Sequence, residues 1–358
     1  MKTTITIVGA GIAGITLARR YAEEQNAEVL IVERRPYIGG YCYDYLDTNG
    51  IFIHKHGPHI FRTANKKVYS FLSRFTEWYD YQHKVLSYVG GHYYPMPINL
   101  DTVNLFSGGN YDSDTVMNYF EQVKTSPKVI DNVKDAVESQ VGAQFYKAFF
   151  EQYTKKQWGM DPEKLPTSII SRIPIRTDRD NRYFTVPYQG IPVQGYTAMM
   201  QKMLEHPNIH ILLNTDYNQI KDEILSEKVF YSGSIDEYFG YCYGKLPYRC
   251  VSFKLEEYDV EEYQPVAVVN YPNDYDYTRI SEFKHFTNNK SKKTVIAKEF
   301  SSAEGDPSYP IPLQENQDLY EKYKKLAFEK KVSFIGRLGQ YKYFSMDQIV
   351  ENILDQKL

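Results

Sequence analysis

The sequence predicts an α/β fold that combines a Rossmann-like nucleotide-binding unit with a helical segment and a set of further strands. Three observations predict this class. A glycine-rich turn lies between two short apolar strands near the amino terminus, residues 101–158 follow a helical pattern, and the part after residue 182 alternates short strands with turns and a few helices. Strands that alternate with helices are typical of α/β architectures.

The amino-terminal segment carries a βαβ dinucleotide fingerprint. Residues 4–8 form the first predicted strand, Gly9-Ala-Gly11-Ile-Ala13-Gly14 forms the turn, and residues 15–24 form an amphipathic helix. The second strand, residues 29–32, ends at Glu33, nineteen positions after Gly14, where a carboxylate can accept a hydrogen bond from a ribose hydroxyl. The glycines allow a pyrophosphate to approach the backbone at a helix N-terminus.

The apolar stretch at residues 5–18 follows Lys2 and also admits a secretory signal as an alternative. No cleavage pattern follows it, and the strand, turn and helix already explain the stretch. We therefore expect a cytoplasmic protein.

Composition excludes several classes of protein. The chain has 358 residues and a net charge of −3, which argues against a nucleic-acid protein that neutralises phosphates. Its three cysteines have neither disulfide-scaffold nor metal-ligand spacing, so we expect no metal. No apolar run reaches the ~20 residues that span a bilayer. The 34 tyrosines suit a core, or a site that stacks a base and hydrogen-bonds phosphates.

The remaining elements follow in order without an internal repeat. Helices are predicted at residues 133–157, 195–205 and 316–330 and from residue 346 onward. Strands are predicted at residues 209–213, 229–232, 248–255 and 266–269, and the first two are expected to be buried. Residues 188–195 read as a strand punctuated by turns.

The fingerprint alone does not separate NAD from FAD, but its extension favours a flavin. Glu33-Arg34-Arg35 leads into Gly39-Gly40, and this pattern resembles the flavoprotein group of amine oxidases and phytoene desaturases. The alternative is that the glycine pair is only a turn after the second strand.

An aromatic stripe and an arginine-rich segment are the candidates for substrate binding. Phe145, Phe149 and Tyr153 recur every four residues and share one helix face, which is typical of a core stripe or of a platform for a nucleotide base. Arg172 and Arg176 follow in residues 168–182, a polar segment that is either a solvated surface or a loop that closes over phosphates.

Several strings, taken together, resemble the UDP-galactopyranose mutase family over residues 9–347, nearly the whole chain. They are Lys156-Gln-Trp158-Gly, Arg172-Ile-Pro, Tyr188-Gln-Gly-Ile-Pro-Val-Gln-Gly-Tyr196, Tyr277-Thr-Arg279-Ile, His54-Lys-His-Gly-Pro-His59-Ile-Phe, Ser232-Gly-Ser-Ile-Asp236, Lys298-Glu299 and Gly336-Arg337-Leu-Gly-Gln-Tyr341-Lys-Tyr343.

The resemblance implies a discontinuous Rossmann-like FAD-binding domain, a helical bundle domain and an antiparallel β-sheet domain. The FAD-binding domain is expected at residues 1–78, 194–245 and 318–358, and the sheet domain at residues 79–99, 183–193 and 246–317. The helical domain is expected at residues 100–182, with a mobile loop at 166–182.

The resemblance also implies roles for individual residues. Arg172 and Arg279 match the arginines that hold the diphosphate, and His59 and Arg62 lie in the string beside the flavin. The implied substrate-binding residues are Phe149, Phe150, Tyr153, Trp158, Tyr183, Arg249, Glu299, Tyr309 and Tyr343. The implied cofactor-binding residues are Gly9, Gly11, Ala13, Gly14, Glu33, Arg34, Gly40, His59, Arg337 and Tyr343. For Arg249 and Glu299 the alternative is a structural ion pair.

The implied activity interconverts UDP-galactopyranose and UDP-galactofuranose. The chain has no GxSxG or HExxH string and no evident carboxylate dyad, so a cofactor is expected to supply the nucleophile. In this family N5 of the reduced flavin is understood to attack the anomeric carbon and displace UDP, and the sugar ring then opens and recloses without net redox change. A cellular reductant of the flavin, a homodimer and a role in cell-surface polysaccharide synthesis are further implications of the resemblance.

Two positions depart from the family pattern. Arg62 stands where many members have histidine, and Ser345 stands where aspartate is common. We expect the first departure either to admit a modified sugar such as UDP-N-acetylgalactosamine or to be neutral. A flavin oxidoreductase of the amine-oxidase or desaturase kind, and an inactive nucleotide-sugar binding protein, remain as alternatives.

Overall fold

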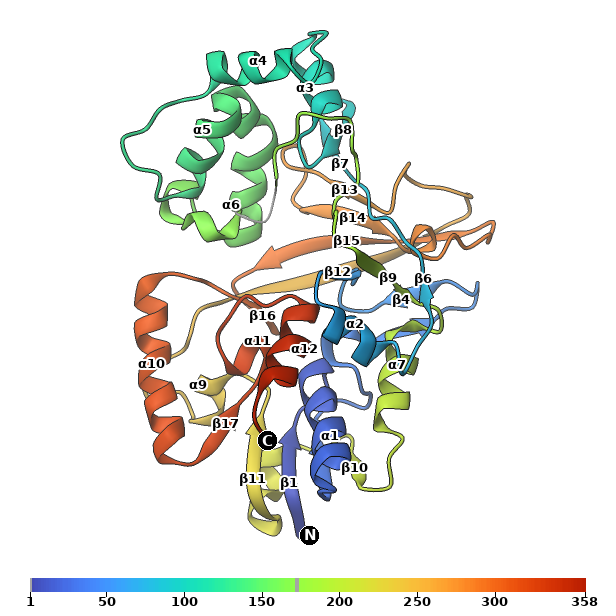
Figure 1. The fold of residues 1–358 in the computed structure, drawn as a ribbon, viewed down its shortest axis with the longest axis vertical. Helices are drawn as coiled ribbons and strands as arrows, with labels where there is room; N and C mark the ends of the chain where they lie inside the picture. The colour runs from blue at the N-terminus through green and yellow to red at the C-terminus, as the bar shows by residue number, and fades with distance from the viewer. Residues whose placement is uncertain (1, 171–173) are drawn as a thin grey trace.

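A five-stranded parallel sheet contains the predicted fingerprint. The computed structural model describes residues 2–170 and 174–358 (Figure 1). The strand order is β10-β2-β1-β11-β17, and the strands are β1 (Lys2–Val8), β2 (Val29–Val32), β10 (Ile209–Leu212), β11 (Leu225–Tyr231) and β17 (Val332–Phe334). The predicted strands and the discontinuous Rossmann-like arrangement are confirmed, because one sheet draws its strands from three distant parts of the chain. The predicted burial of residues 209–213 is wrong, since β10 lies at the sheet edge and is only half-buried.

Helix α1 covers one face of this sheet, and three further helices complete the larger core. The helices are α1 (Ile12–Gln25), α2 (Lys66–Leu72), α7 (Gly195–Leu204) and α12 (Met346–Asp355). Helix α1 packs against α7 and α12, and residues 12–18 are buried on all sides of the helix. Gly14 allows the close packing, because a Cβ there would lie 2.1 Å from the carbonyl oxygen of Gly9.

A seven-stranded sheet forms the middle of the molecule in Figure 1. Its order is β16-β12-β15-β14-β13-β7-β8, and every pairing is antiparallel except that of β13 with β7. The strands are β7 (Val85–Val89), β8 (His92–Met96), β12 (Tyr248–Tyr258), β13 (Val268–Asn270), β14 (Arg279–Glu282), β15 (Thr294–Ser302) and β16 (Pro307–Pro310).

The helical segment lies at the top of the view and packs on this sheet through a second core. It comprises α3 (Leu100–Ser107), α4 (Thr115–Val123), α5 (Val133–Phe145), the π-helix η2 (Tyr146–Glu151) and α6 (Gln152–Trp158). The expectation of one regular helix over residues 133–157 is wrong in detail. Gly142 interrupts α5 with φ +83°, and a Cβ there would lie 2.3 Å from the carbonyl oxygen of Val123. The π-helix then changes the register of the side chains that follow it.

Smaller elements connect these layers. Two short sheets contain β3 (Asp44–Leu46) with β4 (Phe52–His54), and β9 (Tyr188–Pro192) between β5 (Phe61–Thr63) and β6 (Trp78–Tyr79). The remaining α-helices are α8 (Tyr217–Ile220), α9 (Ile235–Tyr238), α10 (Gln314–Glu329) and α11 (Gly336–Gly339), and the 3₁₀ turns are η1 (Gly40–Cys42), η3 (Pro162–Lys164), η4 (Thr167–Ile169), η5 (Lys221–Glu223) and η6 (Phe283–Phe286). None of the helices in the described part of the chain has the length and apolar character needed to cross a membrane.

Candidate active site

Two cavities meet between the parallel sheet and the seven-stranded sheet. The first, here called the glycine cavity, has a volume of about 190 Å³ and is bordered by the turn at Gly9 and Gly11. The second, the arginine cavity, has a volume of about 300 Å³ and contains Arg279. Four residues line both cavities, namely Tyr41, His59, Arg337 and Met346. A ligand in one cavity therefore lies next to a ligand in the other.

The glycine cavity is built to accept an anion at the N-terminus of α1. The N-cap residue of this helix is Gly11, no side chain caps it, and no acidic residue occupies the first turn. The first amides of α1 are thus left to a ligand, and the helix dipole favours negative charge there. Gly9 has φ +106°, and a Cβ at this position would lie 2.0 Å from Oγ of Ser232.

Glu33 fixes the edge of the same cavity. Its Oε2 accepts a hydrogen bond from the amide of Ala10 at 2.8 Å, and its Oε1 accepts one from the amide of Arg35 at 2.8 Å. The carboxylate, which is nearly fully buried, therefore lies beside the glycine turn at the end of β2. This arrangement fits a dinucleotide whose pyrophosphate lies at α1 and whose ribose approaches Glu33.

The expected cofactor residues are distributed over both cavities. Gly9, Gly11, Ala13, Glu33, Arg34 and Gly40 line the glycine cavity, His59 and Arg337 line both, and Tyr343 lines the arginine cavity. Gly14 lines neither, because it packs against Gly9 within the turn.

Sequence reasoning missed one wall of the glycine cavity. Thr215, Asp216, Tyr217 and Asn218 line it directly after β10. Ligands of parallel sheets bind outside the carboxyl ends of the strands. The predicted strand at residues 209–213 was therefore a signal that could have found this wall.

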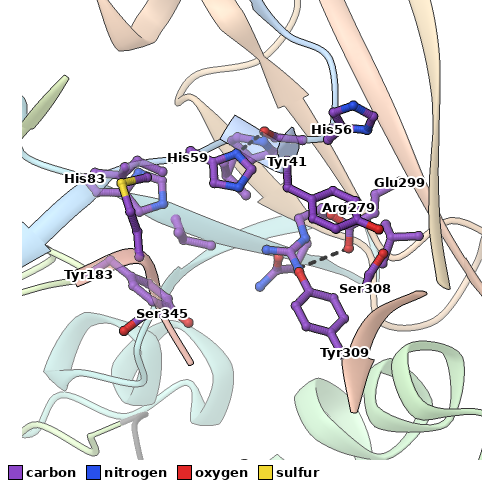
Figure 2. Close-up of a pocket in the computed structure, with 18 of the residues that line it drawn as sticks. Tyr41, His56, His59, His83, Tyr183, Arg279, Glu299, Ser308, Tyr309 and Ser345 are labelled. Atoms are coloured by element: carbon purple, nitrogen blue, oxygen red, sulfur yellow. Dashed lines mark hydrogen bonds and ion pairs between the residues drawn. The ribbon is translucent and has the colours of Figure 1, made fainter. Parts of the chain in front are cut away.

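Arg279 is the best-defined charged group of the arginine cavity. Its Nη2 lies 3.0 Å from Oε1 of Glu299 on the adjacent strand β15, as the dashed line in Figure 2 marks. The Nε of Arg279 is buried and has no hydrogen-bond partner among the described residues. Burial by itself lowers the pKa of Arg279, but Glu299 and nearby tyrosines outweigh this effect and hold that pKa well above its ordinary value. A permanently charged donor thus remains unsatisfied inside the cavity.

The cavity carries positive charge. Arg62, Arg279 and Arg337 line it, whereas Glu299 is the one carboxylate among the described lining residues. The Arg337 guanidinium donates to the carbonyl oxygens of Phe344 at 2.9 Å and Ser308 at 3.3 Å, and it lies 5.1 Å from the ring centre of Tyr309. Such a site suits an anion with several oxygens.

The histidines at this site are neutral at physiological pH. Burial lowers the pKa of His59 to about 3 and that of His83, which lies near Arg279, to about 3. The Nδ1 of His59 lies 2.8 Å from the carbonyl oxygen of Gly57, and its amide donates to Nδ1 of His54 at 3.0 Å. His59 is therefore held as a neutral ring where the two cavities meet.

Aromatic side chains form one wall. Phe149 and Phe150 come from the π-helix η2 and Tyr153 comes from α6, and all three line the arginine cavity. Phe145 does not join them but is fully buried against Phe106, with ring centroids 4.8 Å apart. The predicted four-residue spacing therefore mixes a core residue with two cavity residues.

The other expected substrate residues divide into two groups. Tyr183, Glu299, Tyr309 and Tyr343 line the arginine cavity, whereas Trp158 and Arg249 do not. Trp158 packs edge-on against Tyr343, with ring centroids 5.9 Å apart. Arg249 donates from Nε to the carbonyl oxygen of Gln157 at 3.0 Å, near the end of α6. The alternative of an ion pair between Arg249 and Glu299 is wrong, because Glu299 pairs with Arg279.

The described residues include only part of the arginine-rich segment 168–182. Arg172 lies outside the described residues, so its placement stays a prediction. Arg176 donates to the carbonyl oxygen of Asp180 at 3.0 Å and is not among the residues that line the arginine cavity.

Both departures from the family pattern line the arginine cavity. The guanidinium carbon of Arg62 lies 4.3 Å from the ring centre of Phe184, a distance typical of a cation–π contact. Ser345 precedes α12, donates from its hydroxyl to Oδ1 of Asp347 at 2.6 Å, and donates from its amide to Gln348 at 3.0 Å. No cluster of metal-ligating side chains occurs in residues 2–170 or 174–358.

Related proteins match this sequence over nearly the whole chain. A sequence model described as UDP-galactopyranose mutase matches residues 148–343, and one described as an NAD(P)-binding Rossmann-like domain matches residues 7–75. A probable UDP-galactopyranose mutase of Klebsiella pneumoniae is 38% identical over 359 residues, covering 98% of this chain and 92% of the relative. A dTDP-fucopyranose mutase of Escherichia coli is 37% identical, covering 98% of this chain and 96% of the relative.

Solved structures share the fold at low sequence identity. A crystal structure of reduced UDP-galactopyranose mutase superposes with a TM-score of 0.79 at 16% identity, over 99% of this chain and 93% of that one. A putative protoporphyrinogen oxidase from Exiguobacterium sp. 255-15 gives 0.66 at 11% identity, over 99% of each chain. The fold is thus shared by a mutase and a putative oxidase.

Proposed function

The chain belongs to the UDP-galactopyranose mutase family of flavin-dependent isomerases, and on that premise we propose that it interconverts UDP-galactopyranose and UDP-galactofuranose with FAD in its reduced form. The observation that carries the proposal is the junction of the two cavities. A site for a dinucleotide opens at His59 and Arg337 into a cationic, aromatic-walled site for a second ligand.

FAD fits the glycine cavity by the chemistry of its donors. The uncapped amides of α1 would hold the pyrophosphate, and Glu33 would accept from the adenosine ribose. His59, Arg337 and Tyr41 would border the flavin ring, because they line the passage to the arginine cavity. The turn at Gly9 would let the backbone contact a phosphate, and it has no room for a Cβ.

The UDP moiety fits the arginine cavity. The unpartnered Nε of Arg279 would donate to a diphosphate oxygen, as would the hydroxyls of Tyr183, Tyr309 and Tyr343. Burial raises the pKa of Tyr309 to about 12 and raises that of Tyr183, so both hydroxyls keep their protons. Phe149, Phe150 and Tyr153 would stack on the uracil. Arg172, known from the sequence alone, is proposed as a second diphosphate ligand.

The residues of this chain stabilise the departure and the return of UDP. Bound reduced flavin supplies the nucleophile for the anomeric carbon. As the bond to the diphosphate breaks, negative charge grows on the phosphate oxygens, and the fixed guanidinium of Arg279 stabilises that charge. Because Arg279 and the tyrosine hydroxyls of the cavity keep UDP beside the sugar, UDP can return after the ring has changed size. The overall reaction is then redox-neutral.

The neutral state of His59 and His83 suits this chemistry. With a pKa of about 3, neither histidine protonates the departing diphosphate near neutral pH. Charge stabilisation then falls to the arginines and the tyrosine hydroxyls of the cavity.

The sugar that the site prefers is a second part of the proposal. Arg62 brings a cationic donor to the cavity wall at the position that departs from the family pattern. We infer that UDP-N-acetylgalactosamine is accepted beside UDP-galactose. A dTDP-fucopyranose mutase is almost as similar to this chain as a probable UDP-galactopyranose mutase, so dTDP-fucopyranose belongs in the same substrate panel.

Location and assembly complete the proposal. We infer a cytoplasmic homodimer, supplied with electrons by a cellular reductant and feeding cell-surface polysaccharide synthesis. The support is family membership.

An assay on purified holoprotein tests the proposed function against a flavin oxidoreductase. The reduced protein is mixed anaerobically with each nucleotide sugar, products are separated by chromatography, and the flavin spectrum of oxidised protein is followed with the same sugars. Formation of the furanose isomer supports the mutase. Bleaching of oxidised flavin by the sugar indicates an oxidoreductase, and neither change indicates a protein that only binds nucleotide sugars.

A further inference from the structure

The hairpin between β13 and β14 brings two residues to the arginine cavity. Asn270 ends β13 and Arg279 begins β14, the two are paired in register, and both line the cavity. The tip of the hairpin, residues 271–278, is closed by a hydrogen bond from the amide of Tyr271 to the carbonyl oxygen of Thr278 at 2.9 Å. The position of this tip therefore determines the position of the Arg279 backbone, from which the guanidinium extends into the cavity.

Lys156 holds that tip from the helix that carries the aromatic wall. Its ammonium group donates to the carbonyl oxygens of Tyr271, of Tyr275 at 2.8 Å and of Tyr277 at 3.0 Å. An ammonium group has three protons, and here each has a main-chain acceptor in one hairpin. The ion pairs of the described residues do not include Lys156, so these carbonyls are its main partners.

A second contact joins the same two elements. The side-chain amide of Asn273 donates to the carbonyl oxygen of Ala148 at 3.1 Å. Ala148 lies in the π-helix η2, directly before Phe149, and packs against the second core. The hairpin tip is thus fixed to the aromatic helix at two points, by Lys156 and by Asn273.

We propose that Lys156 is a positioning residue that sets the distance between Arg279 and the aromatic wall, and hence the fit of a nucleoside diphosphate between them. This inference rests on the proposed function, because it assumes that Arg279 holds phosphate while Phe149 and Tyr153 hold the base. Lys156 itself is not among the residues that line the cavity. It acts through the hairpin on Arg279, which does line the cavity.

The ammonium group is poised to lose this function at alkaline pH. Burial lowers the pKa of Lys156 to about 8, although the carboxylates of Asp276 and Asp274 on the hairpin oppose the shift. Arg249, on β12, donates to the main-chain carbonyl oxygen of Lys156 at 3.3 Å and does not contact its ammonium group. Above the pKa one proton is lost, and one of the three carbonyls loses its donor. Affinity for the nucleotide is then expected to fall as the pH rises through about 8.

The test measures UDP binding to the oxidised holoprotein by calorimetry from pH 6.5 to 9.5, with turnover measured in parallel. Lys156→Met is expected to weaken UDP binding about 10- to 30-fold, the usual effect of losing hydrogen bonds from a charged donor. Flavin content is expected to stay unchanged. Lys156→Arg, which keeps its charge at every pH used, is expected to bind UDP more tightly than Lys156→Met and to lose the alkaline fall of the wild type.

Lys155→Met is the matched control on the same helix. The Nζ of Lys155 lies 3.1 Å from Glu151 and 3.5 Å from Asp161, and it forms no hydrogen bond or ion pair with the described residues of the hairpin. This variant is expected to bind UDP like the wild type. Asn273→Ala removes the second contact and is expected to weaken binding several-fold, which keeps the inference testable if Lys156→Met fails to fold.

The outcomes separate the inference from the proposed function. If the wild type does not bind UDP, the proposed function fails and the inference fails with it. If the wild type binds UDP but Lys156→Met, or Asn273→Ala where Lys156→Met does not fold, binds it equally well, only the inference is overturned. An alkaline fall that persists in Lys156→Arg also overturns it, since another group must then titrate.

Discussion

Oε1 of Glu299 accepts from two neighbours at once, Nη2 of Arg279 at 3.0 Å and the hydroxyl of Thr278 at 3.0 Å. Arg279 and Glu299 face each other across β14 and β15, so the ion pair follows from the strand register. The carboxylate is almost completely buried and holds one edge of the guanidinium, which leaves Nε free for a ligand. The pair therefore orients a cationic donor without neutralising the whole cavity.

Removing the guanidinium should strongly reduce catalysis while the cofactor stays bound. Arg279→Met is expected to lower kcat by about 100-fold or more, because a fixed donor to the growing phosphate charge is lost. Glu299→Gln keeps an acceptor for Thr278 but loses the charge that orients Arg279, so we expect a smaller loss of about tenfold. Turnover and flavin absorbance are measured together. Near-normal kcat in Arg279→Met would remove the residue from the mechanism.

Adding a Cβ at Gly9 should prevent the cofactor from binding. Gly9→Ala places a Cβ 2.0 Å from Oγ of Ser232 at a backbone φ of +106°, so the turn must shift away from the phosphate site. The purified variant is expected to be colourless. Gly90→Ala is the control, because Gly90 also has positive φ but has open space around it. A yellow Gly9→Ala protein with wild-type FAD content would contradict the role assigned to the turn at Gly9.

Acid should destabilise the protein through buried neutral histidines. Burial lowers the pKa of His54 to about 4 and that of His83 to about 3, below the ordinary value of 6.5. Between those values the unfolded chain binds protons that the folded chain excludes, so stability falls as the pH drops below 6.5. Each histidine contributes a slope of up to about 1.4 kcal/mol per pH unit.

Urea unfolding at pH 7 and pH 5 measures this slope. His54→Gln replaces the ring by an amide that does not titrate, so it is expected to reduce the slope by one proton. His285 works in the opposite direction, because Glu282 outweighs burial and raises its pKa. An unchanged slope in His54→Gln would show that His54 is protonated in the folded state.

The wall residue Arg62 should tune the choice of sugar. Arg62→His removes the long cationic donor that lies over Phe184. The ratio of kcat/KM for UDP-N-acetylgalactosamine to that for UDP-galactose is expected to fall about tenfold, the scale of one lost polar contact. Phe184→Leu, which removes the ring beneath the guanidinium, is expected to change the ratio in the same direction. An unchanged ratio in both variants would leave the departure without a role in specificity.

Local patterns predicted the parallel sheet well. The strands at residues 4–8 and 29–32 and the glycine turn are signals within one short stretch, and the structure confirms them. The helix predicted at residues 133–157 fails at Gly142 because the approach of Val123, far away in sequence, determines the backbone there. The π-helix likewise separates Phe145 from Phe149 in a way that periodicity does not show.

The sequence predicts the site at residues that belong to a family string. It does not predict which side chains line the cavity where tertiary packing determines their direction. Arg279, Glu299 and Tyr309 lie in one cavity as expected. Trp158 and Arg249 do not line it. Trp158, at the end of α6, packs edge-on against Tyr343, and Arg249, on β12, donates to the main chain at the end of α6. The sequence alone shows neither the Arg279–Glu299 ion pair nor the hydrogen bonds from Lys156 to the hairpin, because both depend on the register of β13, β14 and β15.

The redox dependence of isomerisation tests the central claim most directly. One preparation of FAD-loaded protein is assayed with UDP-galactopyranose after chemical reduction, again after reoxidation in air, and once more after a second reduction. The proposed mechanism predicts furanose product only in the two reduced samples, with no net loss of reducing equivalents per turnover. Equal product from the reoxidised sample would contradict it, because the flavin would then not be the nucleophile.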